Sequence, residues 1–402
     1  MEREMPKIVC LGDACCGCGA CVAKCPKGCI EMRPDWCGFL HPAVDEESCV
    51  RCDACNAACP AMAERQEDGL EGVIWAKSKD ITERLNSSSG GVFALLAHDV
   101  LEADGVVCGA AWADGCKHVR HVLVDSEGGL DSVMRSKYVQ SSVGREVYEG
   151  VRAALRAGRR VLFAGTACQV AGMRAYLGKL ADSDGFLTVD VICHGVPSPL
   201  LWERWAEYKE GCANAPLRGV NMRSKTTGWL SYSAMYEYIA EKDGAPVCDG
   251  SVFGDDWYMK AFLQNASLRK SCFSCPVKRS CGSDVTLGDF WGIQSAHPEV
   301  DYEGGVSAVF ANTAKGLSVV ESLKPRLEWG KSSLEKVLPG NSSLLRSVSP
   351  YEGRDEFMCD LGANVSIGSL EEKYAFKIKV TLSQRVRGLL SRVKRWLLED
   401  HG

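Results

Sequence analysis

The 402-residue sequence lacks the features that would place it in a membrane, outside the cell or on nucleic acid. It contains no run of about 18 apolar residues, so we expect no transmembrane helix. The first residues, MEREMPKIVC, contain no apolar segment typical of a signal peptide. The formal net charge of −5 argues against a generic nucleic-acid binder. We therefore expect a cytoplasmic protein with reduced cysteines.

Two nucleotide-binding signatures are also missing from the sequence. No G-x-G-x-x-G motif follows a predicted strand, and no Walker A motif occurs. The usual Rossmann-type binding of a nicotinamide cofactor is therefore unsupported. Hydrophobic residues make up 46% of the chain and charged residues 25%, which is ordinary for a globular protein of two or three domains.

Cysteine, by contrast, is abundant: the chain has 22, and twelve of them lie in the first 60 residues. Two runs share the spacing C-x2-C-x2-C-x3-C-P, the first ending at Pro26 and the second at Pro60. This is the spacing of bacterial ferredoxins, in which three thiolates of one run surround a 4Fe–4S cubane and the fourth serves the other cluster. The predicted ligands of cluster 1 are Cys15, Cys18, Cys21 and Cys59, and those of cluster 2 are Cys49, Cys52, Cys55 and Cys25.

Zinc is the alternative metal, although zinc sites usually combine two C-x2-C pairs. The insert between the two runs predicts a small β-hairpin. We expect the remaining cysteines of this region to be buried small hydrophobic residues. They are Cys10, Cys16, Cys29 and Cys37.

From residue 72 onwards, strand and helix signals alternate along the chain. The predicted strands are 73–78, 105–111, 118–124, 160–165, 186–192 and 285–290, with polar strands near Leu217 and Tyr232. The predicted helices are 91–101, 144–157, 168–177, 200–209 and 255–264. This βαβ rhythm predicts an α/β body with an at least partly parallel sheet.

Two further cysteines follow buried strands of this body, where ligands of open α/β sheets bind. Cys168 comes after the strand 160–165, and Cys193 comes after the strand 186–192. Cys272 and Cys275 form a separate C-x2-C pair. Together these four could close a third cubane; the alternatives are buried core thiols for the first two and a structural zinc half-site for the pair.

Five short motifs in this order resemble the coenzyme F420 hydrogenase/dehydrogenase beta-subunit family, including its ferredoxin-fused members and the related 7-hydroxymethyl chlorophyll a reductases. The motifs are NSSSGG (86–91), SKYVQS (136–141), GTACQ (165–169), CHGVPSP (193–199) and RKSCFSC…SDVTLGDFWG (269–292). The resemblance implies a flavin, usually FAD with FMN as the alternative, next to a 4Fe–4S cluster. The cysteines that match its cluster ligands are Cys168, Cys193, Cys272 and Cys275, with Cys281 as a competing ligand.

The same motifs contain the residues expected to bind the flavin. They are Ser88, Ser89, Gly90, Gly91, Lys137, Tyr138, Gln140, Thr166, Gln169, Asp289 and Trp291. The first four precede a helix and would offer N–H groups to a pyrophosphate, or the serines would simply cap the helix. Lys137 and Tyr138 would face the flavin ring, or occupy an exposed strand edge. The candidate catalytic residues are Lys137 and His194, and the latter could equally be a loop histidine.

These expectations give a fold class of α+β and α/β: a bacterial-type 2×(4Fe–4S) ferredoxin domain followed by an α/β flavin-binding body. The expected regions are 1–66 (ferredoxin-type), 67–155 and 156–345 (N- and C-terminal parts of the beta-subunit-like body) and 346–402 (C-terminal tail). Residues 373–397 predict a basic amphipathic helix, which would contact an acidic partner or the inner membrane face, or pack on the acidic body.

The resulting functional hypothesis is an iron–sulfur flavoprotein oxidoreductase. It would pass electrons between a two-electron carrier such as F420, a flavin and the clusters, with a redox protein or a small electron carrier as partner. One alternative is an electron-transfer subunit that has no substrate of its own and docks on a catalytic partner. Another is a reductase of a surface-polysaccharide or lipid pathway.

Overall fold

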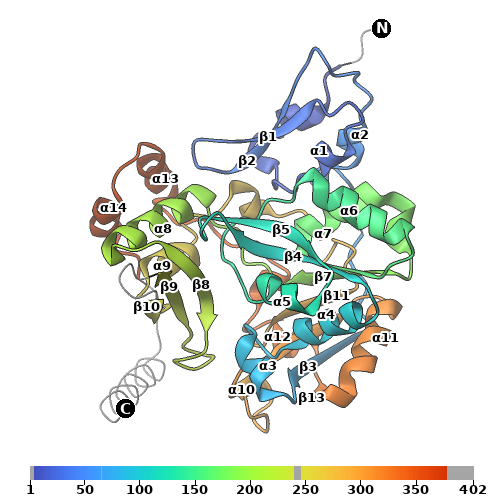
Figure 1. The fold of residues 1–402 in the computed structure, drawn as a ribbon, viewed down its shortest axis with the longest axis vertical. Helices are drawn as coiled ribbons and strands as arrows, with labels where there is room; N and C mark the ends of the chain where they lie inside the picture. The colour runs from blue at the N-terminus through green and yellow to red at the C-terminus, as the bar shows by residue number, and fades with distance from the viewer. Residues whose placement is uncertain (1–3, 65, 240–245, 378–402) are drawn as a thin grey trace.

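The computed structural model describes residues 4–64, 66–239 and 246–377 (Figure 1). Its N-terminal module, residues 4–64, is small and contains the predicted hairpin. The elements are η1 (Lys7–Cys10), η2 (Gly12–Ala14), α1 (Ala20–Lys24), β1 (Ile30–Pro34), β2 (Leu40–Val44) and α2 (Ala54–Ala57). Strands β1 and β2 pair antiparallel, with Ile30 opposite Val44. The buried side of the module consists mainly of cysteine and alanine, so it has little apolar core of its own.

The body is built on an eight-stranded mixed sheet with the order β13-β3-β12-β11-β7-β6-β4-β5. Its strands are β3 (Gly72–Ser78), β4 (Val106–Ala113), β5 (His118–Val124), β6 (Val161–Thr166), β7 (Phe186–Val191), β11 (Val285–Asp289), β12 (Ser307–Ala311) and β13 (Leu327–Lys331). Neighbours among β4, β6, β7 and β11 are parallel, whereas the outer pairs are antiparallel. The predicted α/β body with a partly parallel sheet is therefore confirmed.

Helices cover both faces of this sheet because each helix has one apolar side. On one face, α4 (Val92–Glu102), α5 (Glu127–Val133) and α11 (Ala314–Leu323) form one apolar cluster with the strands. On the other face, α6 (Arg145–Arg156) and α7 (Ala167–Leu177) form a second cluster, which includes Ala20 and Ala23 of α1. The N-terminal module is therefore packed against α6 and α7, as Figure 1 shows.

The remaining short elements connect or extend this framework. They are α3 (Ile81–Asn86), η3 (Gly178–Asp182), α10 (Ile293–Ala296), η5 (Lys324–Arg326), α12 (Leu334–Val337) and η6 (Ser342–Leu344). The strands β12 and β13 and the helix α11 were not predicted from the sequence. They extend the sheet beyond β11 and carry the chain back to β3.

A second lobe surrounds a three-stranded antiparallel sheet with the order β10-β9-β8. Its elements are α8 (Pro199–Ala213), β8 (Leu217–Ser224), β9 (Ser233–Ile239), β10 (Pro246–Val252), α9 (Trp257–Leu263), η4 (Lys270–Ser274), α13 (Arg354–Gly362) and α14 (Ile367–Lys373). Its core is rich in aromatic residues and includes Phe357 and Tyr374. Residues 354–376 of the expected C-terminal tail are therefore folded onto this lobe, whereas the predicted basic helix lies almost wholly outside the described residues. In the ranges that the structure describes, no helix combines the length and apolarity needed to cross a membrane.

Candidate functional site

A cavity of about 570 Å³, called here the first cavity, lies at the carboxyl ends of β6 and β7. Its walls come from the loop before α4, the segment 133–139, the strand ends, and Arg223 of β8 with the loop that joins β8 to β9. This volume is within the usual range for small-molecule sites, and the position is where open α/β sheets bind ligands.

The first cavity gathers most of the residues that the sequence motifs single out. Its walls include Ser88, Ser89, Gly91, Lys137, Tyr138, Thr166, Gln169, His194, Asp289 and Trp291. Two expected residues are not on the wall. Gly90 is packed behind it, because a Cβ at this position would lie 2.3 Å from the carbonyl oxygen of Ala76. Gln140 instead donates a hydrogen bond to the carbonyl oxygen of Cys16, 3.0 Å away, at the boundary with the N-terminal module.

The loop before α4 presents a helix N-terminus to the first cavity. Gly91 is the N-cap residue, with φ +88°, and no side chain caps the helix. The serines are used elsewhere: Ser88 Oγ accepts from the N–H of Ser136 at 2.8 Å, and Ser89 Oγ donates to the carbonyl oxygen of Val306 at 2.9 Å. The first N–H groups of an eleven-residue helix thus have no side-chain acceptor, which suits an anionic ligand group.

A buried ion pair that the sequence did not reveal closes another wall. Arg223 of β8, whose side chain is 1% exposed, donates to Asp289 Oδ1 at 2.8 Å. Its guanidinium carbon lies 3.9 Å from the ring centre of Tyr232 and 4.9 Å from that of Trp291. Within the described residues the Arg223 Nε atom has no hydrogen-bond partner. No sequence signal marks Arg223, because its partners are distant in the chain.

The two candidate catalytic residues differ in their surroundings. Lys137 donates to the carbonyl oxygen of Met134 at 2.7 Å, and burial, with the charge of Arg135, lowers its pKa to about 7. The His194 ring lies 2.6 Å from Asn265 Oδ1, and burial lowers the pKa of His194. Near neutral pH Lys137 can therefore hold or release a proton, whereas His194 is a neutral ring already engaged by an amide.

A hydrogen-bonded chain of side chains leads from the first cavity to Cys168. His121 Nδ1 lies 3.1 Å from Ser141 Oγ, Gln169 Nε2 donates to that oxygen at 2.9 Å, and Thr166 Oγ1 donates to Gln169 Oε1 at 3.0 Å. Thr166 Oγ1 also lies 3.2 Å from Cys168 Sγ. Burial lowers the pKa of His121 to about 4, so the ring is neutral. Its Nε2 faces the carbonyl oxygen of Ala164 and must carry the proton, which fixes the donor direction along the chain.

A second cavity, called here the cysteine cavity, adjoins the first. It is lined by the four cysteines predicted at the strand ends and in the C-x2-C pair: Cys168, Cys193, Cys272 and Cys275. Thr166 and residues 191–196 line both cavities, so the two share a wall. Four thiols converging from three loops are a donor set that a 4Fe–4S cluster can use. Across the described ranges, no three His, Cys, Asp or Glu side chains come close enough to hold a single metal ion.

Cys281, the competing ligand, is not on the wall of the cysteine cavity. Its thiol lies 3.6 Å from Asp68 Oδ2, and its N–H donates to the same oxygen at 3.1 Å. Several groups that line the cavity were not predicted, including the cations Lys278 and Arg279. Cys16 reaches it from the N-terminal module, and Asp190 does so at the end of β7. Burial raises the pKa of Asp190 to about 6 although it accepts hydrogen bonds from Ser283 and Thr286.

Cysteines of the two N-terminal runs also gather. Those predicted for cluster 2 line a small cavity together with Cys29: Cys25, Cys49, Cys52 and Cys55. Of those predicted for cluster 1, Cys15, Cys21 and Cys59 interact electrostatically with one another. Cys18 faces α7, where a Cβ at Gly172 would lie 3.0 Å from its sulfur. Of the four other cysteines of this module, which were expected to be buried, Cys37 is buried, Cys16 and Cys29 are partly exposed, and Cys10 is exposed, so the expectation was wrong for three of them.

Residues 158–334 match the family model for the C-terminal part of the coenzyme F420 hydrogenase/dehydrogenase beta subunit. This part of the chain belongs to the F420 hydrogenase/dehydrogenase beta-subunit family. The resemblance noted in the sequence is thereby confirmed, and the family is one of oxidoreductases. The chain is also similar to one in the F420-reducing [NiFe] hydrogenase complex from Methanosarcina barkeri, with 18% identity and a TM-score of 0.43 over 80% of this chain and 98% of that one. No curated protein matches the sequence.

The region matched by the beta-subunit family contains the whole wall that the two cavities share, Thr166 and residues 191–196. It also contains Gln169 and all four thiols of the cysteine cavity. The N-terminal module, the loop before α4 and Lys137 lie outside it. The first cavity therefore combines walls from inside and outside the matched region.

Proposed function

We propose that this chain is an iron–sulfur flavoprotein oxidoreductase that exchanges electrons between a reducible small molecule and 4Fe–4S clusters. The first cavity would hold a flavin, taken to be FAD, and the cysteine cavity a 4Fe–4S cluster. The N-terminal module would hold two more clusters with the ligand sets that its spacing predicts. The supporting observation is the wall that the two cavities share, which would bring a flavin and a cluster next to each other.

The first cavity offers what an anionic, flat ligand needs. The uncapped N-terminus of α4 suits a pyrophosphate. Three basic residues on the wall, Arg135, Lys137 and Arg223, add positive charge, and one carboxylate, Asp289, balances Arg223. Tyr138, stacked on Phe262 at 4.8 Å between ring centres, supplies an aromatic surface.

When bound, a flavin supplies the exchange between two-electron and one-electron transfer. The residues of the chain would orient it and control protons. Lys137 can give a proton to a ligand in the first cavity, or take one from it, near neutral pH. Thr166, fixed by Gln169, can turn its hydroxyl toward the Cys168 sulfur once that sulfur is a thiolate. Hydrogen bonds to cluster sulfurs are one of the means by which proteins set cluster potentials.

The test is anaerobic purification of the full chain followed by iron, sulfide and flavin analysis. Three cubanes predict about twelve irons per chain, along with one flavin. Cys193→Ser should lose about four irons, since it removes one ligand of one cubane. Cys108→Ser is the matched control, because this core thiol of β4 is fully buried and lines neither cavity. Cys281→Ser should also keep its iron.

Two results would contradict this proposal. Wild-type protein without flavin would leave the first cavity without its proposed ligand. Equal iron contents in Cys193→Ser and Cys108→Ser would show that the four thiols of the cysteine cavity do not hold a cluster.

A second candidate function is electron transfer to a partner protein without a substrate of this chain's own. It is favoured by two exposed residues that line the cavity predicted for cluster 2: Cys52 is exposed, and Val50 is 50% exposed. A cluster ligand exposed beside an apolar residue suits contact with a transient redox partner. Turnover of reduced F420 or NADH with a viologen acceptor by the purified chain would exclude this alternative.

A further inference from the structure

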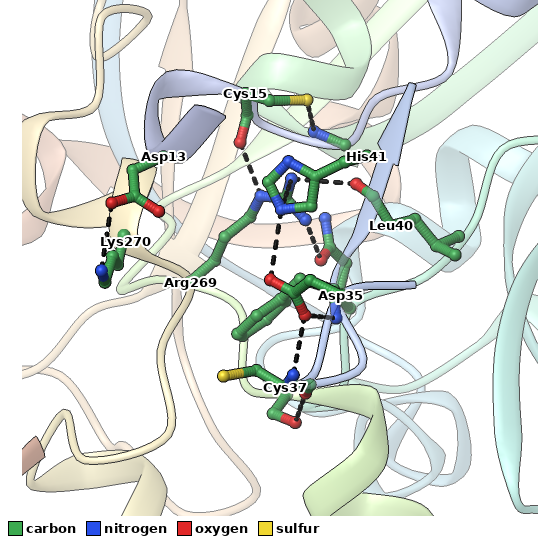
Figure 2. Close-up of polar contacts among 12 residues, drawn as sticks. Asp13, Cys15, Asp35, Cys37, Leu40, His41, Arg269 and Lys270 are labelled. Carbon is green, nitrogen blue, oxygen red and sulfur yellow. Dashed lines mark hydrogen bonds and ion pairs between the residues drawn. The ribbon is translucent and has the colours of Figure 1, made fainter. Parts of the chain in front are cut away.

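Arg269 belongs to the body but uses its guanidinium to hold the N-terminal module (Figure 2). Its Nε donates to the carbonyl oxygen of Cys15 at 2.6 Å, and its Nη2 donates to that of Leu40 at 2.9 Å. Nη1 donates to Gln140 Oε1 at 3.0 Å, and Nη2 lies 3.3 Å from His41 Nε2. All three nitrogens therefore lie against neutral oxygen acceptors or the ring of His41, whose own pKa is raised to about 9 by its contacts with Asp35 and Cys15.

This cation is buried without a carboxylate beside it. Arg269 is 2% exposed, and among the described residues no Asp or Glu oxygen lies within ion-pair distance of its guanidinium. The acid closest to the network, Asp35, contacts His41 at 3.3 Å and accepts from the N–H groups of Cys37 and Phe39. A buried charge with no counter-charge is costly, so an anion is expected next to it.

The residues around Arg269 indicate which anions would balance its charge. Cys15, whose carbonyl oxygen it binds, is a proposed ligand of cluster 1. Cys272, whose N–H donates to the carbonyl oxygen of Arg269 at 3.0 Å, is a proposed ligand of the third cluster. The charge of Arg269 also acts on the thiols of Cys168 and Cys272, whereas Lys278, on the wall of the cysteine cavity, acts on those of Cys193 and Cys275. A cubane bound by four thiolates carries negative charge, and reduction by one electron adds to it.

A glycine in the first cysteine run leaves room for the Arg269 side chain. A Cβ at Gly17, in the first cysteine run, would lie 3.0 Å from Arg269 Nη1 and 2.6 Å from Gln140 Nε2. The neighbouring cation, Lys270, has a different environment. Lys270, 44% exposed, forms an ion pair with Asp13 at 3.0 Å (Figure 2). Of these two neighbouring cations, only Arg269 is turned inward and left without a carboxylate.

We propose that Arg269 is the shared counter-charge of cluster 1 and the third cluster, and that it raises the reduction potentials of both while holding them side by side. This inference rests on the proposed function. Arg269 is a positioning residue, because it acts on the clusters through charge and through the backbone of Cys15 and Cys272. The electron in each measured step comes from the titrant and adds one negative charge to an oxidised cluster.

The test is a redox titration of the full, anaerobically purified chain, followed by electron paramagnetic resonance. Arg269→Met should make cluster 1 and the third cluster harder to reduce. At a fixed solution potential their reduced-to-oxidised ratios should fall at least tenfold, which corresponds to about 59 mV for a one-electron couple. Cluster 2 should keep its potential, since Arg269 contacts none of its proposed ligands, and it serves as an internal reference.

Further variants separate charge from shape. Lys270→Met removes the neighbouring cation and should leave all three potentials unchanged. Gln140→Glu places a carboxylate beside Arg269 Nη1, but it also removes the hydrogen bond to the Cys16 carbonyl oxygen. Compared with Gln140→Met, which removes that hydrogen bond without adding a charge, Gln140→Glu should lower the same two potentials even if Arg269→Met does not fold.

Three outcomes would overturn the inference. Equal potentials for cluster 1 and the third cluster in Gln140→Glu and Gln140→Met would do so, as would an equal shift of all three clusters. Wild-type protein with too little iron for three cubanes would overturn the proposed function as well, so the two failures can be told apart.

Discussion

The buried pair of Arg223 and Asp289 gives a quantitative test of how the first cavity is built. Arg223 is 1% exposed and Asp289 is 16% exposed, and the pair is joined at 2.8 Å. Asp289 also accepts from Trp229 Nε1 at 2.8 Å. Removing one partner of such a pair leaves an uncompensated buried charge and costs about 3–5 kcal/mol. For a domain of 150–250 residues, about 3 kcal/mol corresponds to a fall of roughly 6–12 °C in Tm.

A double-mutant cycle isolates the interaction. Arg223→Met and Asp289→Asn should each lower the apparent Tm of the anaerobic protein, measured at one scan rate. The double variant should be more stable than the sum of the single effects predicts, with a coupling energy of roughly 1–3 kcal/mol, because it leaves no unpaired charge. Arg218→Met is the control on the same strand: its side chain is 57% exposed and lies 3.7 Å from Glu237, so it should cost less than about 1 kcal/mol. Additive effects in the cycle would refute the pairing argument.

Three further predictions follow from single contacts. In the wild-type protein, the rate of flavin reduction by a two-electron donor should decline above about pH 7, because Lys137 loses its proton there. Stopped-flow measurements of this rate against pH should show no such decline for Lys137→Met. Gly90→Ala should destabilise the loop before α4, since its Cβ would lie 2.3 Å from a backbone oxygen, and should reduce the amount of flavin that stays bound during gel filtration. Gly128→Ala, with open space around its Cβ, should retain as much flavin as the wild-type protein. Tyr148→Phe should lower the free energy of unfolding by about 1 kcal/mol, because it removes the 2.8 Å hydrogen bond from the buried hydroxyl to the carbonyl oxygen of Cys18; an unchanged denaturant midpoint would contradict this.

The sequence allowed the strands of the central sheet to be predicted because local patterns specify them. The strand 118–124 alternates in burial over its first four residues, and β6 and β7 are mainly apolar runs followed by a helix or loop. Because parallel strands end at one edge, the cysteines that follow β6 and β7 could be expected to meet. The strand β12 was missed although all five of its residues are buried, because its apolar run, 308–311, is only four residues long and no periodicity distinguishes a run of that length from part of a helix.

The residues that complete the site were harder to predict because their partners are distant in the chain. Arg223 and Asp289 are 66 positions apart, and Arg269 and Cys15 are 254 apart. Gln140 is another residue whose contacts could not be predicted from the sequence. Its motif associates it with a flavin, yet its side chain bridges Cys16 and Arg269, which becomes visible only when the module is packed on the body.

The contacts of the module show that its two cysteine runs are held by different means. The body supplies donors to backbone carbonyls along the first run: Gln140 to Cys16, Tyr148 to Cys18 and Arg145 to Cys25, in addition to Arg269 to Cys15. The second run is held by bonds inside the module, such as those of Asn56 with Ile8 and Asp53. A small module with little apolar core depends on bound metal for much of its folding energy. The body therefore fixes the part of the module that faces the cysteine cavity, whereas the part around cluster 2 depends more on its own cluster.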